Sequence, residues 1–161
     1  MPTIDTLTRT ITVNPAFLQE IKEAHRELWA VLADCRRLSE TPIHGRRRAN
    51  EFAERLRELC DRLAFHFSLE EAYGYFEEPV RAAPRLVRRC ERLRDEHAVL
   101  YVDLAQLADL AESRLVESDG ADRMVTVQSA FIAFDERFRD HEAAEIELIQ
   151  SALGDDLGEG D

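Results

Sequence analysis

The sequence predicts an all-α fold, an up-down-up-down antiparallel bundle of four helices. Apolar residues recur at alternating steps of three and four along four long segments, which is the spacing of one face of an α-helix. Short stretches that contain proline or glycine separate the segments, and such short connections make consecutive helices antiparallel neighbours. The chain has 161 residues, which is enough for one domain with a core of its own.

Sequence signals bound the first two helices. Asn14 offers an N-cap side chain and Pro15 suits the first helical position, so a helix is expected from there to about Glu40. A loop with proline and glycine follows. The second helix is expected from about Arg46 to Glu77, shortly before a proline that ends it.

The third and fourth helices are bounded in the same way. Pro84 is expected to open the third helix, which runs to about Glu117. A turn of serine, aspartate and glycine follows. The fourth helix is expected from about Asp122 to Leu153, closed by Gly154.

The two ends of the chain are expected to lie outside the bundle. Residues 1–13 are expected to form a short extended N-terminal arm. Residues 154–161 are acidic and rich in glycine, which predicts a disordered C-terminal tail. The bundle domain is therefore expected to span residues 14–153.

Charge and cysteine content narrow the class of protein. The formal net charge of −12 argues against nucleic acid or an anionic membrane surface as a partner. No apolar run approaches the ~20 residues that a membrane-spanning helix needs. The three cysteines form no CxxC pair and are expected to be reduced and buried, which indicates a cytoplasmic protein. They are Cys35, Cys60 and Cys90. We expect a monomer or a weak homo-oligomer.

Polar residues interrupt the apolar face of all four helices. The six residues concerned are His25, His66, Glu70, His97, His141 and Glu145. At ~1.5 Å of rise per residue, all six fall in one layer roughly 10–20 Å from the same end of the bundle. A single histidine among apolar residues is commonly a core residue with a hydrogen-bond partner. Two buried carboxylates in the same layer also need positive charge beside them, because an unpaired buried carboxylate costs several kcal/mol. A pair of divalent metal ions meets that need.

The spacing within two of the helices favours a two-metal site. In HxxxE pairs, a histidine and a carboxylate lie one turn apart on one face, so each histidine can bind one metal while its glutamate bridges both. A ferritin-like site requires Glu-x-x-His on two helices instead. The residues three positions before the four histidines exclude that arrangement, since they are Lys22, Leu63, Arg94 and Phe138.

The order His, HxxxE, His, HxxxE over about residues 14–152 resembles the hemerythrin-like family, also called the HHE cation-binding domain. The resemblance implies a non-haem centre of two iron ions, Fe²⁺ or Fe³⁺, bridged by two carboxylates and by an oxo or hydroxo group. It also implies that His25 and His66 bind one metal and that His97 and His141 bind the other. Zinc and manganese are alternative occupants.

The chain departs from the oxygen-carrying members of the family. Those members have a fifth histidine one turn from the third-helix histidine, where this chain has Leu93 and Tyr101. Their second carboxylate is an aspartate at the position of Ile146, so Glu145 takes that role here. Four imidazoles and two bridging carboxylates supply about eight bonds, and an oxo or hydroxo bridge adds about two. Two six-coordinate metals accept about twelve, which leaves roughly two positions for water, O2, peroxide or NO. Such a site favours redox reaction or sensing over reversible oxygen carriage.

Several residues are expected close to the centre. Trp29, Tyr101 and Phe138 each lie one turn from a ligand histidine, mainly as core aromatic residues. The Tyr101 hydroxyl is a candidate weak ligand or hydrogen-bond donor. Glu71 and Glu142 adjoin ligand positions and are expected to face solvent, with Glu71 as a substitute ligand if the helix register shifts.

Three classes of function fit these features. In the preferred one, a non-haem di-iron protein interacts with O2, a related small oxidant or NO, for sensing or for oxidant or iron handling. In the second, the chain is a peroxidase-like or O2-reducing enzyme. In the third, it is a metal-storage or structural bundle that holds zinc. The expected partner in the first two is a small diatomic molecule or a peroxide.

Overall fold

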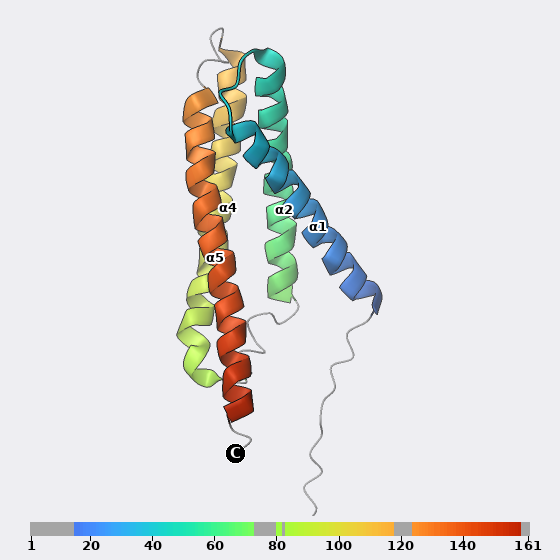
Figure 1. Cartoon of the computed structure of the whole chain (residues 1–161), viewed down its shortest axis with the longest axis vertical. Coiled ribbons are helices and arrows are strands. Elements are labelled where there is room, and N and C mark those ends of the chain that lie inside the picture. The colour runs from blue at the N-terminus through green and yellow to red at the C-terminus, as the bar shows by residue number, and fades with distance from the viewer. Residues whose placement is uncertain (1–14, 73–79, 82, 118–123, 159–161) are drawn as a thin grey trace, which may run out of the picture.

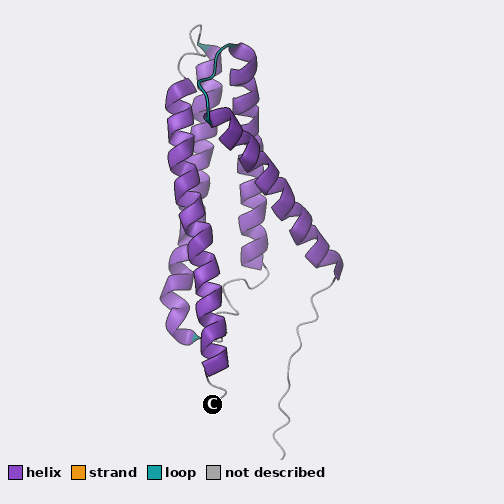
Figure 2. Ribbon diagram, in the orientation of Figure 1, coloured by secondary structure: helices purple, strands orange, loops and turns teal. Residues whose placement is uncertain are grey.

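The computed structural model describes residues 15–72, 80–81, 83–117 and 124–158, and within these residues the fold is helical without strands (Figure 2). Its main elements are α1 (Pro15–Ser39), α2 (Arg46–Ala72), the 3₁₀ turn η1 (Pro84–Leu86), α4 (Val87–Val116) and α5 (Met124–Gly158). The prediction of an all-α bundle is confirmed.

Three of the four long helices lie side by side, and the fourth diverges from them. Helix α4 packs along both α2 and α5, and Figure 1 shows the three helices roughly aligned, with α5 beginning near the end of the bundle where α4 ends. Helix α1 packs against α2 and α5. Its C-terminal half lies close to the other helices, whereas its N-terminal end points away from them (Figure 1). This divergence bears directly on His25.

The observed helix ends differ from the prediction in two places. The Pro84 region forms the 3₁₀ turn first, and the α-helix begins at Val87. Helix α5 continues to Gly158 instead of ending at Gly154, which corrects the expected tail. Gly154 does not adopt a positive φ, so nothing in its backbone ends the helix there. The expected N-terminal arm, the end of the second helix near 77, the start of the fourth near 122 and residues 159–161 lie outside the described residues.

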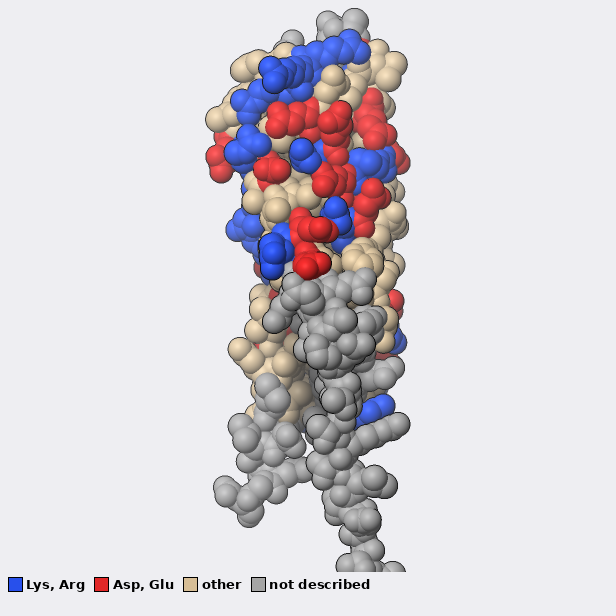
Figure 3. Space-filling view, turned by 90° about the vertical axis from the view of Figure 1, so that its right-hand side faces the viewer, with Lys and Arg blue, Asp and Glu red and all other residues tan. Residues whose placement is uncertain are grey.

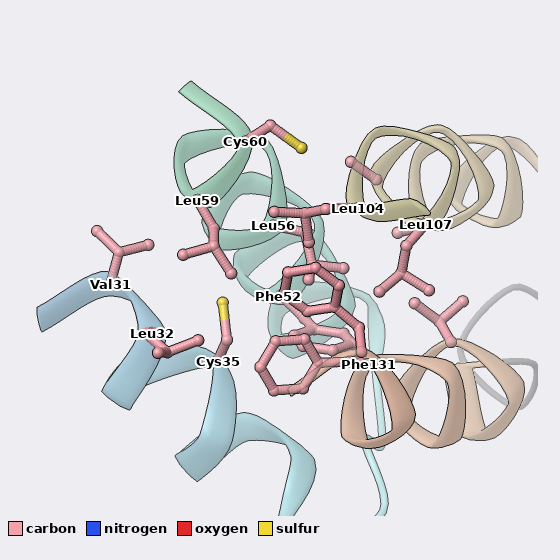
Figure 4. Packing of buried hydrophobic residues seen from close by; sticks show 14 of the residues in the cluster. Val31, Leu32, Cys35, Phe52, Leu56, Leu59, Cys60, Leu104, Leu107 and Phe131 are labelled. Carbon is pink, nitrogen blue, oxygen red and sulfur yellow. The ribbon is translucent and has the colours of Figure 1, made fainter. Parts of the chain in front are cut away.

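The apolar core is divided into two clusters. The larger one is built from α1, α2, α4 and α5, and it contains Phe52 and Phe131 edge to face at 6.2 Å between ring centres (Figure 4). The smaller one joins the start of α4 to the end of α5, through residues such as Cys90, Leu93 and Leu148. The polar residues predicted as a metal site fall between these clusters along α4 and α5.

Specific polar contacts fix the C-terminal half of α1 to α5. The Arg36 guanidinium donates two hydrogen bonds to the Asp135 carboxylate, at 2.9 and 2.8 Å. The buried amide of Gln128 donates to the carbonyl groups of Leu38 and Thr41, both at 2.8 Å. Because Gln128 satisfies carbonyls at the end of α1, it fixes where this helix ends against α5.

The three cysteines are buried and unpaired. Burial raises the pKa of the Cys35 thiol to about 12 and that of Cys60 to about 11, and it also raises the pKa of Cys90. Thiols with such pKa values are weak nucleophiles at neutral pH. The expectation that the cysteines act as buried apolar residues is therefore confirmed.

The described surface is charged and mixed in sign. Figure 3 shows acidic and basic side chains interspersed over one face of the bundle. None of the helices in the described ranges is both long and apolar enough to cross a membrane. The expected absence of a nucleic-acid partner stays a prediction from the net charge.

Candidate metal centre

Five of the six predicted ligands lie on the inward faces of three helices. His66 and Glu70 are one turn apart on α2, His97 is on α4, and His141 and Glu145 are one turn apart on α5. All five are buried. The same three- and four-residue spacing that buries the apolar side chains also brings these five into the interior.

The first donor group joins α4 to α5. His97, His141 and Glu145 place one ligand atom each within 4.8 Å of one another. Glu145 Oε1 is 3.2 Å from His97 Nε2 and 2.9 Å from His141 Nε2. Glu145 is only 1% exposed, so its carboxylate depends on these imidazoles, or on a cation, for compensation of its charge.

The second donor group joins α2 to α5 and includes a residue that was expected to face solvent. His66, Glu70 and Glu142 also place one ligand atom each within 4.8 Å of one another. His66 Nε2 is 2.8 Å from Glu70 Oε1 and 3.4 Å from Glu142 Oε1. The side chain of Glu142 is 16% exposed, which corrects the expectation. Glu142 follows the buried Phe138 by four positions, and that spacing could have indicated an inward position.

Glu70 connects the two donor groups. Its Oε1 contacts His66 of the second group, and its Oε2 lies 3.3 Å from His97 Nε2 of the first group. A single carboxylate with one oxygen toward each group has the placement that a bridging ligand requires.

His25, the sixth predicted ligand, is not in either group. It is exposed, and its Nε2 accepts a hydrogen bond from Trp29 Nε1 at 2.5 Å. Its ring centre is 5.5 Å from that of His66, so it borders the second group without joining it. The divergence of α1 from the bundle accounts for this position (Figure 1).

The predicted aromatic neighbours occupy different environments. Trp29 bonds His25, and the buried Phe138 lies 6.0 Å from Trp29 between ring centres. Tyr101 is 40% exposed, a position that gives no support to a hydroxyl aimed at the metals. Phe67, which sequence reasoning missed, stacks on His97 with 3.9 Å between ring centres and 6° between planes. As the residue after His66, it gave no signal of a contact with another helix.

A family model described as the hemerythrin HHE cation-binding domain matches residues 16–153. The chain belongs to the hemerythrin HHE family. No curated protein and no solved structure matched the chain. Membership confirms the resemblance found in the sequence, and it assigns cation binding to a domain that spans nearly the whole chain.

The buried residues of this hemerythrin HHE domain fit a pair of metal ions. Glu70 Oε2 and His141 Nε2 are buried, and neither has a hydrogen-bond partner of suitable geometry among the described residues. Imidazole nitrogens and carboxylate oxygens suit iron, zinc and manganese. Both atoms lie beside the first donor group, and a cation bound there would satisfy them.

Two further carboxylates contact the outer nitrogens of the ligand histidines. Glu71 Oε1 is 3.1 Å from His97 Nδ1, and Glu96 Oε2 is 2.7 Å from His141 Nδ1. A histidine that donates Nδ1–H to a carboxylate keeps the Nε2 lone pair free for a metal and holds its ring in place. Sequence reasoning missed Glu96, because it reaches from α4 to a histidine of α5.

Replacement of Glu96 with alanine is expected to weaken metal binding about 10-fold. Loss of such an outer carboxylate typically costs about 10- to 100-fold in affinity, and the half-exposed position of Glu96 favours the lower value. Competition with a chelator measures the change. Glu91→Ala, at an exposed position of the same helix, is the matched control and is expected to bind metal as the wild type does.

Without metal, the imidazoles and carboxylates of the centre shift each other's pKa. Burial alone would lower the pKa of His66 and His97, but hydrogen bonds outweigh it and raise these pKa values to about 10 and about 9. Glu142 and Glu70 raise the pKa of His66, and Glu145 and Glu70 raise that of His97. Burial alone would raise the pKa of Glu70, but the adjacent imidazoles of His66 and His97 lower it. In the metal-free protein, protons on the imidazoles therefore balance the buried carboxylates.

Proposed function

We propose that this chain binds two iron ions and interacts with O2, a related small oxidant or NO, in sensing or in oxidant or iron handling. The observation that supports the proposal best is the pair of buried donor groups with Glu70 between them. Family membership supports cation binding, and the two donor groups support two cations rather than one.

The ligands proposed for each metal follow from the contacts and the family. His97 and His141 would hold one metal, and His66 with His25 would hold the other, with Glu70 and Glu145 bridging. For His25 to join through Nε2, this atom must leave Trp29 and the N-terminal half of α1 must approach α2 and α5. We therefore infer that the metal-loaded chain is a closed up-down-up-down antiparallel bundle.

When bound, the iron pair supplies redox chemistry and exchangeable positions for a small ligand. The chain's own residues shield these positions from bulk water. Phe67 and Phe138 cover the side of the larger apolar cluster, and Leu93 and Leu148 cover the other side. On the remaining side, an open surface pocket of about 300 Å³ between α4 and α5 is lined in part by His141, Glu96 and Leu100. Its size and position suit the approach of a diatomic molecule or a peroxide to the centre.

Metal content and the visible spectrum together test this function. Protein loaded anaerobically with Fe²⁺ is expected to hold two irons per chain by elemental analysis. Exposure to air is expected to produce a charge-transfer absorption band in the near-ultraviolet and visible range. The double variant His66→Ala/His141→Ala is the negative control and should bind neither ion. A colourless protein that prefers zinc and does not respond to air would instead support a structural or metal-storage bundle.

A further inference from the structure

We propose that Glu142 is an additional metal ligand, which binds the same metal as His66 and gives the centre a third inner carboxylate. The proposal rests on the two-metal function proposed above and deepens it, because it specifies the donor set. Family membership assigns cation binding to the domain as a whole. Glu142 is not one of the two glutamates of the HxxxE pairs, which are Glu70 and Glu145.

Glu142 reaches the centre from the helix opposite His66. It follows His141 directly on α5, yet its carboxylate lies 3.4 Å from the Nε2 atom of His66 on α2. The side chain is largely buried, and its carboxylate, the Glu70 carboxylate and the His66 nitrogen converge within 4.8 Å. Three possible ligand atoms, two from α2 and one from α5, are thus close enough together to bind one metal ion.

The nitrogen that each glutamate contacts separates inner from outer carboxylates. Glu71 and Glu96 contact Nδ1 atoms, and their side chains are 44% and 45% exposed. Glu70 and Glu145 contact Nε2 atoms and are buried. Glu142 contacts an Nε2 atom and is much less exposed than the outer pair, so it belongs with the inner carboxylates.

Two carboxylates at one imidazole nitrogen carry more negative charge than that imidazole can balance. Even a protonated His66 has a single positive charge, and its Nε2 offers at most one proton to Glu70 and Glu142 together. A metal ion at this point binds the nitrogen and both carboxylates at once, and it offsets the repulsion between the two negative charges.

Glu142 also supplies a donor at the second group, where His25 does not. The His25 lone pair accepts the Trp29 N–H, so in this arrangement the metal at His66 has donors only from α2 and α5 among the described residues. Glu142 therefore allows this metal to bind while α1 diverges, and His25 adds to the set when α1 closes. A third carboxylate also makes the site harder and more negative, which favours ferric over ferrous iron.

Metal titration of Glu142→Ala and Glu142→Gln tests the proposal. Metal-free protein is titrated anaerobically with Fe²⁺ against a chelator, and with Co²⁺ to follow the visible bands of the bound ion. Both variants are expected to bind one of the two metals at least about 10-fold more weakly, with altered Co²⁺ bands. Glu142→Asp should recover part of the affinity. Glu136→Ala, at an exposed position of α5, is the matched control and should behave as the wild type.

The outcomes separate this proposal from the proposed function. If the wild type binds two metals and both Glu142 variants bind two with unchanged affinity and spectra, Glu142 is not a ligand and only this proposal fails. If the wild type itself binds fewer than two metals, the two-metal function fails, and the donor set with it. Circular dichroism and the Tm of each metal-free variant verify folding, and Glu142→Gln keeps the side-chain volume. Altered Co²⁺ bands in Glu142→Gln support direct binding, since a carboxylate that only lies nearby would leave the donor set of the bound ion unchanged.

Discussion

Replacement of His97 with alanine is expected to abolish tight binding of one of the two metals. The His97 Nε2 atom lies 3.3 Å from Glu70 and 3.2 Å from Glu145, so it is the imidazole that both proposed bridging carboxylates approach. Loss of a direct ligand exceeds the effect of an outer partner, and we expect affinity for that metal to fall by more than about 100-fold. Elemental analysis after gel filtration should give one metal per chain where the wild type retains two.

The helices of the His97→Ala variant should still form, because the larger apolar cluster does not depend on this residue. Far-ultraviolet circular dichroism checks this, and His97→Leu serves as a second variant that leaves a smaller void beside Phe67. His44→Ala is the matched control, since His44 is exposed in the loop between α1 and α2. Retention of two metals with wild-type affinity in both His97 variants would contradict the ligand assignment.

The helices could be predicted because local spacing determines which residues are buried. Steps of three and four placed residues such as Leu56, Leu104 and Phe131 on inward faces, and all three are buried. The predicted end of the fourth helix was wrong, because Gly154 was expected to end it and α5 continues to Gly158. Glycine permits a left-handed end without requiring one, and this glycine continues the helix.

The same spacing identified five buried polar residues, but not the contacts between helices. Glu142 and Glu96 each follow or precede a predicted ligand histidine in the chain, and each contacts a histidine of another helix. Such contacts depend on how far each helix is rotated and shifted against its neighbour, which the period of one helix does not determine. The position of His25 depends on the angle of α1, and spacing within α1 carries no information about that angle.

Removal of both metals is expected to lower the Tm by roughly 15–30 °C. A ligand that binds only the folded chain stabilises it by about 4 kcal/mol when free metal is about 1,000 times its Kd, and two sites give about 8 kcal/mol. For a chain of this length each kcal/mol changes the Tm by roughly 2–4 °C. Calorimetry with excess Fe²⁺ under anaerobic conditions, and again after chelation, measures the difference. The His66→Ala/His141→Ala variant should show almost no difference between the two conditions.

The stabilisation by metal is expected to increase with pH, because the metal-free protein loses its own charge compensation as pH rises. The pKa values of His66 and His97, about 10 and about 9, lie above the ordinary 6.5, so their contribution is fully present below about pH 6.5 and is lost as pH rises through 9 and 10. The lowered pKa of Glu70 contributes stability above its ordinary 4.5, which is lost as pH falls toward its folded value. The metal-free chain should therefore be most stable between about pH 4.5 and 6.5. Metals replace the imidazole protons and bind more tightly as pH rises, so the Tm difference should be larger at about pH 8.5 than at about pH 6. An equal difference at both pH values would show that protons and metals do not compete for these imidazoles.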